Sequence, residues 1–264
     1  MTDDASTGAG LRARDLTAGY GARAVIDGLH LDVPRGRFTA VIGPNGCGKS
    51  TLVRALSRTL RPTRGVVEID GAPAHRMPTR HVARTLAFLP QEPIAPEGVT
   101  VRSLVSRGRH PYHSAWRRSH PGDAAAIAGA LEATEMLDLV DAPIASLSGG
   151  QRQRAWIALV LAQETEYVLL DEPTSFLDIG HQIDVLRLCG RMRSEGRTVV
   201  AVLHDLSQAA RFADRLVLMH DGGIVAEGEP AAVLTERNVR EVFGLDCRIA
   251  PDPVSGTPMV VPLG

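Results

Sequence analysis

The sequence predicts an α/β fold built around a phosphate-binding loop, and three observations support this. The segment GPNGCGKST, residues 43–51, follows an apolar run at 38–42 and precedes an amphipathic stretch. This strand, loop and helix order is the one that a phosphate loop requires. Two further apolar runs of strand length, 167–170 and 198–203, end in acidic or histidine side chains. Residues 93–146 are instead rich in proline turns and helical spacing, which predicts a helical insertion in the α/β core.

The loop itself has the residue types that phosphate binding needs. Its glycines at 43, 46 and 48 let the backbone wrap closely and point N–H groups inward, and the following helix adds the positive end of its dipole. Lys49 supplies a mobile charge for the outer phosphates, and Ser50 supplies a hydroxyl for Mg²⁺. The alternative is a glycine-rich turn with an incidental Lys-Ser pair, which the flanking strand and helix disfavour.

Lys49 is the only lysine of the chain, and all its other permanently positive side chains are those of arginines. A compact ammonium fits among phosphate oxygens where a planar guanidinium does not, which explains its retention here. The single lysine also argues against a small GTPase, because the Asn-Lys-x-Asp motif that recognises guanine needs a second one.

Composition narrows the class of protein. The chain has 264 residues, a net charge of −1 and a pI of about 6.8, so nothing suggests a basic nucleic-acid surface. Its three cysteines, Cys47, Cys189 and Cys247, are too far apart for metal-ligand spacing and fit a reducing cytosol. The N-terminus lacks the features of a signal peptide, and no apolar stretch has the length of a membrane span. We therefore expect any membrane association to come through a partner.

The densest basic patch runs from Arg102 to Arg118 and contains the cluster RGRHPYHSAWRR, residues 107–118. Tyr112 and Trp116 interleave with its charges, which is compatible with nucleic-acid binding. Because the total charge is near zero, the sequence favours a solvated loop or a partner-contact surface. Asp123, after Pro121-Gly122, is a candidate N-cap for a helix over 124–140.

The chain before the phosphate loop predicts two short strands, 11–20 and 24–33, joined by a turn at Tyr20. The ring of Tyr20 offers a face on which a base can stack, although an exposed turn tyrosine is unremarkable by itself. After the loop, 65–71 predicts a hairpin strand and 85–89 a buried strand that ends at Pro90-Gln91.

A second possible anion site begins the next predicted helix. In SLSGGQRQR, Ser148-Gly149-Gly150 opens a helix that runs to about Ala162. A small hydroxyl residue and two glycines at a helix start leave room for an anion at the N–H groups. One nucleotide rarely needs two such sites from one subunit.

The remaining chemistry lies at strand ends. Asp171, after the strand 167–170, is placed to hold Mg²⁺ through water, and Glu172 can polarise an attacking water. His204 follows the strand 198–203. Ligands of open α/β sheets lie beyond the carboxyl ends of the strands, so we expect these ends and the phosphate loop to converge. A hairpin about 220–222, a helix over 229–243 and a proline-rich tail complete the chain.

Taken together, these motifs resemble those of the ATP-binding subunit of ABC transporters over nearly the full length. Several motifs occur in the order that is usual for the family. They are GPNGCGKST (Walker A), Gln91 (Q-loop), LSGGQ at 147–151 (signature), YVLLDEP at 167–173 (Walker B), Ser175 to Asp178 (D-loop), His204 (switch histidine) and Tyr20 (A-loop aromatic).

The resemblance implies a role for each matching residue. The implied catalytic residues are Glu172 as general base, with His204, Lys49 and Gln91. The implied ligands of Mg²⁺ are Ser50, Gln91 and, through water, Asp171. The implied nucleotide-contacting residues are Tyr20, Gly43, Pro44, Asn45, Gly46, Cys47, Gly48, Lys49, Ser50 and Thr51 and, from a second subunit, Ser148, Gly149, Gly150 and Gln151, with Asp178 linking the two active sites.

It also implies the architecture: a P-loop NTPase with a mixed central sheet, an N-terminal antiparallel β subdomain and an inserted α-helical subdomain. The expected limits are a disordered 1–10, a nucleotide-binding core at 11–92 and 163–245, a helical subdomain at 93–162 and a tail at 246–264.

The implied mechanism is dimer closure around two ATP, hydrolysis and reopening, coupled to permease subunits in the membrane and indirectly to a solute-binding protein. The subunit is then peripheral, on the cytoplasmic face of the inner membrane. The segment GRHPY at 108–112 and the tail are similar to those of importer ATPases for ferric siderophores, haem or cobalamin. The alternative is a soluble ABC ATPase, for example in iron–sulfur cluster assembly.

Cys47 suggests one further expectation. It lies in the phosphate loop near a helix N-terminus, where a thiolate is favoured, so we expect a reactive thiol that ATP protects.

Overall fold

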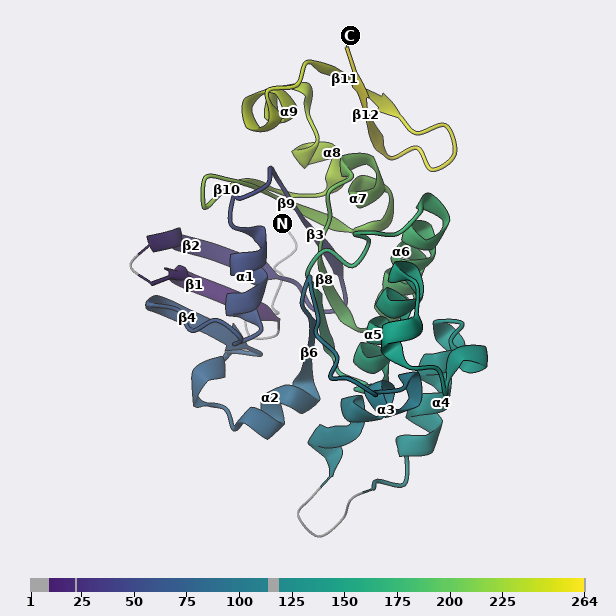
Figure 1. Cartoon of the computed structure of the whole chain (residues 1–264). Coiled ribbons are helices and arrows are strands. Elements are labelled where there is room, and N and C mark those ends of the chain that lie inside the picture. Colours follow the sequence, from purple (N-terminus) through teal and green to yellow (C-terminus); the bar gives the residue numbers. More distant parts are fainter. Residues whose placement is uncertain (1–9, 22, 114–118, 264) are drawn as a thin grey trace. The chain divides into compact units, whose positions relative to one another are not determined.

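The computed structural model describes residues 10–21, 23–113 and 119–263 and divides into two compact units (Figure 1). The first comprises residues 1–77 and 189–264, and the second comprises 78–188. Helix α6 (Ile179–Ser194) begins in the second unit and ends in the first. We expected residues 1–10 to be disordered; residues 1–9 lie outside the described residues, whereas Gly10 is buried and its N–H donates to Asp70 Oδ1 at 2.9 Å. The expected domain limits stay a prediction.

An antiparallel sheet occupies the amino-terminal part of the first unit. Its strand order is β2-β1-β4-β5, with bounds β2 (Arg23–Val33), β1 (Leu11–Tyr20), β4 (Arg64–Ile69) and β5 (Ala72–Pro73). Apolar residues of β1 are fully buried in two alternating pairs, Leu11 with Ala13 and Leu16 with Ala18, on either side of an irregularity at Asp15. Because successive strand residues point to opposite faces, this alternation buries one face of the sheet. The expected antiparallel β subdomain is confirmed.

Four further strands of the first unit are neighbours in the order β10-β9-β3-β8. Their bounds are β10 (Gly223–Gly228), β9 (Arg215–His220), β3 (Phe38–Ile42) and β8 (Thr198–Val202). β3 pairs in parallel with both β8 and β9, whereas β10 is antiparallel to β9, so the pairing is mixed as expected. All residues of β3 and β8 are buried, which explains their unbroken apolar sequence.

Helices cover these strands within the same unit. α1 (Lys49–Leu56) contacts β1, β2 and β8, and α7 (Leu206–Phe212) contacts β3 and β9. The helix expected over 229–243 is two helices, α8 (Pro230–Val233) and α9 (Glu236–Phe243), because Thr235 between them accepts a hydrogen bond from Asn238 N–H and caps the second. A short 3₁₀ turn, η1 (Ala74–Arg76), follows β5.

The tail has more structure than its proline content suggests. It forms a hairpin of β11 (Cys247–Pro251) and β12 (Pro258–Pro262). β12 contacts α7, and Val260 N–H donates to Ser207 Oγ at 3.2 Å. The two apolar pieces of the tail are therefore paired strands that pack on the first unit.

The second unit contains a parallel pair, β6 (Leu86–Leu89) and β7 (Tyr167–Leu170), and a set of helices. The helical elements are α2 (Thr79–Thr85), α3 (Val101–Ser106), η2 (Arg107–Tyr112), α4 (Asp123–Ala133), η3 (Leu137–Leu139), η4 (Ile144–Ser146) and α5 (Gly149–Ala162). α5 contacts α3, α4 and η2. This part confirms the helical insertion.

Two expectations about α4 are wrong. The helix ends at Ala133 rather than Val140, because Glu135 has a φ of 55° and interrupts the helical backbone. Asp123 is the first residue of the helix rather than its N-cap, which is Gly122. Among the described residues, no helix has both the length and the apolar character to cross a membrane.

Candidate active site

The loop at 43–51 surrounds the ammonium of its own lysine. Lys49 Nζ donates to the carbonyl oxygens of Gly43 at 2.7 Å and Pro44 at 2.8 Å, and Lys49 is only 5% exposed. The charge therefore sits inside the curve of the loop, preorganised for an anion that would replace or join these carbonyl contacts.

Gly43 shows why the loop needs glycine at its start. Its φ is 149°, and a Cβ there would lie 2.3 Å from the carbonyl oxygen of Met219 and 2.9 Å from Cys47 Sγ. On the other side, Gly222 N–H donates to the carbonyl of Cys47 at 3.0 Å. The loop is thus held against the β9–β10 turn, and a side chain at Gly43 would push it away.

The helix after the loop presents its amino end without a side-chain cap. α1 begins at Lys49, its N-cap Gly48 has a φ of 104°, and its first turn carries no acidic residue. The first N–H groups of a helix have no intrahelical acceptors and carry the positive end of the dipole. This end of α1 is therefore suited to a phosphate, as the sequence predicts.

The remaining candidate side chains of the first unit are those of Tyr20 and His204. Tyr20 ends β1, is 50% exposed, and its hydroxyl accepts from Arg54 Nη1 of α1 at 3.1 Å. His204 is exposed just after β8, next to Leu203, whose N–H donates to the carbonyl of Val41 in β3 at 3.1 Å. Because β3 and β8 are parallel neighbours, the phosphate loop after β3 and His204 after β8 both lie at the carboxyl ends of these strands.

The second unit brings the carboxylates and the glutamine together. β6 and β7 are parallel, and Asp171 N–H donates to the carbonyl of Leu89 at 2.9 Å. Gln91 Nε2 donates to Glu172 Oε2 at 2.8 Å, and Ser175 Oγ donates to the same oxygen at 2.9 Å. Asp171 is fully buried. Sequence reasoning missed the contact of Ser175, for which the only signal is its position three residues after Glu172.

Glu172 also carries backbone strain. Its φ of 53° lies in the left-handed region that residues other than glycine seldom adopt. Such strain persists only where the surroundings fix it, and the two donors to the carboxylate are part of that fixation. The strained backbone and the two hydrogen bonds together aim one carboxylate oxygen in a set direction.

The start of α5 is a capping box. Ser148 Oγ accepts from Gln151 N–H at 3.2 Å, and Gln151 Oε1 accepts from Ser148 N–H at 3.0 Å. A cavity of about 280 Å³ adjoins this helix start, lined also by Phe176 and Asp178 from the segment after β7. The structure thus places the LSGGQ segment and the expected D-loop aspartate beside one cavity.

Asp178 is itself fixed by His181. His181 N–H donates to Oδ1 at 3.0 Å, and its Nδ1 lies 2.7 Å from Oδ2. The backbone and side-chain hydrogen bonds from His181 lower the pKa of Asp178.

Comparison with known proteins identifies the family. A family model described as ABC transporter matches residues 26–175. The achromobactin transport ATP-binding protein CbrD of Dickeya dadantii is 49% identical over 255 residues, which are 96% of this chain and 95% of its own length. The chain belongs to the ABC transporter family. The ferric enterobactin transport ATP-binding protein FepC of Escherichia coli K12 is likewise 49% identical, over 96% of this chain and 94% of its own length.

Solved structures agree with this assignment. A metal-chelate type ABC transporter in an inward-facing conformation superposes with a TM-score of 0.81 at 31% identity and 97% coverage of both chains. A dimeric bacterial ABC transporter cassette gives a TM-score of 0.74 at 26% identity, covering 83% of this chain and 98% of its own. The expected fold class and the ABC-type ATPase class are both confirmed, and the ABC ATPase binds ATP.

The expectation for Cys47 of this ABC ATPase is wrong. Its side chain is only 5% exposed, and burial raises the pKa of the thiol. The charge of Lys49 acts in the opposite direction but is the smaller effect. The pKa shift is therefore opposite to the one that the helix end was expected to produce, and protection of the thiol by ATP stays a prediction.

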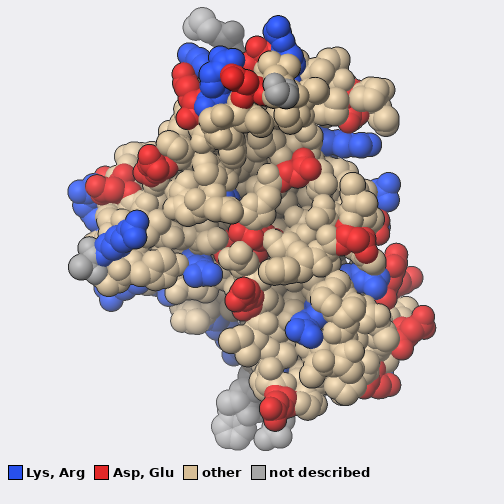
Figure 2. Space-filling view, turned by 45° about the horizontal axis from the view of Figure 1, so that its top comes forward, with Lys and Arg blue, Asp and Glu red and all other residues tan. Residues whose placement is uncertain are grey.

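The interpretation of residues 107–118 as a solvated loop or contact surface is also wrong for its central arginine. Arg109 is 2% exposed and lies in a network of ion pairs. Trp116 lies outside the described residues. On the face drawn in Figure 2, basic and acidic side chains are interspersed, with no continuous basic area.

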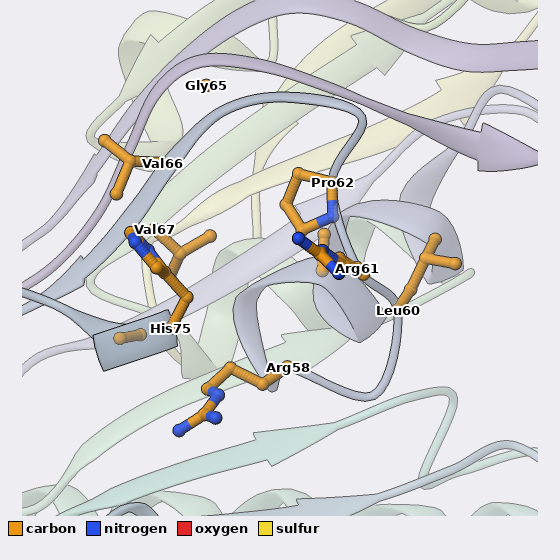
Figure 3. A pocket seen from close by; sticks show the side chains of 10 residues that line it. Arg58, Leu60, Arg61, Pro62, Gly65, Val66, Val67 and His75 are labelled. Carbon is orange, nitrogen blue, oxygen red and sulfur yellow. The ribbon is translucent and has the colours of Figure 1, made fainter. Parts of the chain in front are cut away.

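A larger cavity in the first unit was not foreseen. It has a volume of about 540 Å³ and lies between the end of α1, β4 and η1 (Figure 3). Arg58, Arg61 and His75 line it together with apolar side chains, and none of its ten described lining residues is acidic. Its basic residues come from two separate segments, Arg58 and Arg61 after α1 and His75 in η1, which is why no sequence motif marks it.

Proposed function

We propose that the chain is the ATP-hydrolysing subunit of an ABC importer for ferric siderophores, or for a related ligand such as haem or cobalamin. The observation that carries this is the 49% identity, over nearly the full length of both chains, to the achromobactin and ferric enterobactin ATP-binding proteins. A hemin import ATP-binding protein of Rhodococcus jostii is less similar, at 40% identity. The siderophore is therefore the first ligand class to test.

Residues of each unit have a role in ATP hydrolysis under this proposal. The Tyr20 ring stacks on adenine, residues 45–51 wrap the phosphates, and Lys49 holds the outer ones. Glu172, aimed by Gln91 and Ser175, accepts a proton from the attacking water. His204 contacts the γ-phosphate. The barrier falls because positive charge and N–H dipoles meet the charge that develops on the phosphate oxygens.

The donor set fits Mg²⁺. Ser50 hydroxyl, Gln91 amide and Asp171 carboxylate oxygens are hard ligands of the kind that this ion prefers. When bound, the ion neutralises charge on the phosphate oxygens during transfer.

A pair of subunits explains the two anion sites. In a head-to-tail dimer, each ATP lies between the Lys49 loop of one subunit and the Ser148–Gly150 helix start of the other. Asp178 connects the two sites across the dimer. ATP favours the closed dimer and ADP does not, so hydrolysis resets the cycle by differential binding.

The proposal includes partners in and near the membrane. Transmembrane permease subunits receive the motion through the region of Gln91, and a solute-binding protein delivers the ligand to them. The ATPase then sits on the cytoplasmic face of the inner membrane as a peripheral subunit.

The test is affinity purification of the tagged chain from gently solubilised source membranes, followed by mass spectrometry. A polytopic permease, with a solute-binding lipoprotein, is the expected result. If membranes shown to retain intact complexes yield only soluble partners, the importer proposal fails and a cytosolic ABC ATPase, as in iron–sulfur cluster assembly, replaces it.

A further inference from the structure

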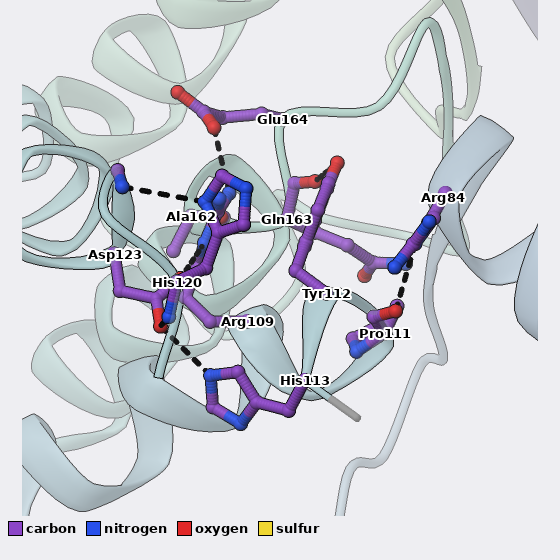
Figure 4. A network of polar contacts seen from close by, with 11 residues as sticks. Arg84, Arg109, Pro111, Tyr112, His113, His120, Asp123, Ala162, Gln163 and Glu164 are labelled. Carbon is purple, nitrogen blue, oxygen red and sulfur yellow. Dashed lines mark hydrogen bonds and ion pairs between the residues drawn. The ribbon is translucent and has the colours of Figure 1, made fainter. Parts of the chain in front are cut away.

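Arg109 is the largest fully buried side chain among the described residues. Figure 4 shows the network of polar contacts around it. Its Nε donates to Asp123 Oδ1 at 2.9 Å, and its Nη1 donates to the carbonyl of Ala162 at 2.8 Å and to Glu164 at 2.6 Å. The Tyr112 ring lies 4.0 Å from the guanidinium carbon. A buried guanidinium is costly unless its donors are satisfied, and here they bond to groups at the start of α4 and at the end of α5.

The carboxyl end of α5 accepts hydrogen bonds from both Arg109 and Tyr112. Ala162 is the last residue of the helix, and Tyr112 Oη donates to the carbonyl of the next residue, Gln163, at 2.8 Å. The last carbonyls of a helix have no intrahelical donor and carry the negative end of its dipole. Arg109 and Tyr112 therefore supply donors, and Arg109 a positive charge, where the helix needs them.

The backbone of η2 also rests directly on the last turn of α5. A Cβ at Gly108 would lie 2.4 Å from the carbonyl oxygen of Leu159 and 3.2 Å from the nitrogen of Gln163. No side chain fits in that gap without separating the two backbones. Gly108 thus permits the approach that brings Arg109 and Tyr112 into reach.

The other side of the guanidinium is fixed to α4. Asp123, in the first turn of that helix, also accepts from His120 N–H at 2.7 Å and lies 2.8 Å from His113 Nε2. A carboxylate at a helix start is stabilised by the dipole. One buried cation therefore joins the negative end of α5 to an anion at the positive end of α4.

We propose that Arg109, with Tyr112, is a positioning residue for the ATP-binding end of α5. The helix is 14 residues long, which is about 21 Å at the usual rise. A rigid helix transmits a displacement of one end to the other, so the clamp at Ala162 sets where Ser148 and Gly150 lie. The part of this inference that concerns ATP rests on the proposed function.

The first arm of the test does not depend on that function. Backbone amide NMR signals of Gly149, Gly150 and Gln151 are compared between the parent and Tyr112→Phe, which removes one hydrogen bond, and Arg109→Met. The control is Arg102→Met, an exposed arginine of α3 whose partner Asp141 is also exposed. We expect the three signals to shift beyond the spread of the control, while those of Gly46 and Gly48 do not. Unchanged signals in folded Tyr112→Phe overturn the inference, even where Arg109→Met fails to fold.

The second arm measures function in the Glu172→Gln background. The dissociation constant of the ATP-bound dimer is obtained by light scattering, and ATP binding to the monomer by a fluorescent nucleotide. We expect Arg109→Met to weaken the dimer by about tenfold and to leave monomer binding unchanged, with Arg109→Lys intermediate. Because folded molecules dominate both equilibria, lost stability alone does not produce this pattern.

The outcomes separate the two proposals. A parental dimer constant in folded Arg109→Met, or an equal loss of monomer ATP binding, overturns the positioning role. If the Glu172→Gln parent stays monomeric at saturating ATP and Mg²⁺, the proposed function fails, and the NMR arm alone decides whether Arg109 positions α5.

Discussion

Lys49 in the first unit and Arg109 in the second are both buried cations, but they are held in opposite ways. Lys49 bonds to carbonyls five and six residues before it, inside one short loop. Arg109 bonds to groups 14, 53 and 55 residues after it, on two helices and a connecting segment. The first is fixed by local backbone geometry and the second by tertiary packing. We therefore predict that a change at Lys49 affects the chemistry at the phosphate loop, whereas a change at Arg109 affects how α4 and α5 are held together.

The largest expected effect concerns the carboxylate that acts with the Lys49 loop. Glu172→Gln removes the proton acceptor and keeps the shape, so we expect ATP hydrolysis to fall by about 10²–10⁴-fold with ATP binding retained. Steady-state phosphate release measures the first and nucleotide binding the second. The control is Glu241→Gln, which alters an exposed carboxylate of α9 instead. Hydrolysis at the parental rate in Glu172→Gln would remove Glu172 from the mechanism.

Lys49→Arg tests the local half of the comparison. The charge is kept, but a planar guanidinium does not fit the position of the ammonium between two loop carbonyls, so we expect about 10²-fold slower hydrolysis. The matched control is Arg58→Lys, which makes the opposite exchange, arginine to lysine, at a position outside the loop. An unchanged ATPase rate in Lys49→Arg contradicts the assignment of the loop.

The contrast also explains what the sequence could predict. The phosphate loop, the apolar strands β3, β7 and β8 and the start of α5 depend on neighbours in sequence, and short motifs predict them. The same holds for the pairing of strand ends within each unit. Residues such as Gln91 and Glu172 follow buried strands, so their meeting in the second unit was expectable from the strand pattern.

The burial of Arg109 was not predictable in this way. Its partners Asp123 and Glu164 are distant from it in the sequence and form no short motif with it. In addition, a run of arginine and histidine is by composition a surface feature. Gly108 gave no signal either, because the close approach to Leu159 exists only in the folded chain. Cys47 failed for a related reason: the sequence places it at a helix end but does not reveal its burial. Tertiary contacts reversed both expectations.

Arg109→Met tests the tertiary half by stability. It leaves Asp123, which is 14% exposed, without the guanidinium and places an apolar side chain against the carbonyl of Ala162. We expect the free energy of unfolding to fall by about 3 kcal/mol, measured by urea denaturation. The exposed pair of Arg102 with Asp141 gives the comparison, since Arg102→Met should cost less than about 1 kcal/mol. Equal losses in the two variants would mean that the buried network stabilises no more than a surface pair.

The smallest expected effect is a pH dependence of the free energy of unfolding, which comes from Asp123 in the same network. Burial raises the pKa of Asp123, but hydrogen bonds from Arg109, His120 N–H and His113 outweigh it and lower the pKa to about 2. The value in an unfolded chain is about 3.9. The ionised form is therefore favoured by folding, so its contribution is complete above about pH 4 and disappears as the pH falls through about 2.

Asp123→Asn lacks this contribution at every pH. Between pH 5 and pH 2 we expect the free energy of unfolding of the parent to fall by about 1 to 2 kcal/mol more than that of the variant. Other carboxylates titrate in both proteins and cancel in the difference, and Asp141→Asn, at an exposed position, should follow the parent. Parallel curves for the parent and Asp123→Asn would show that Arg109 does not hold this carboxylate ionised.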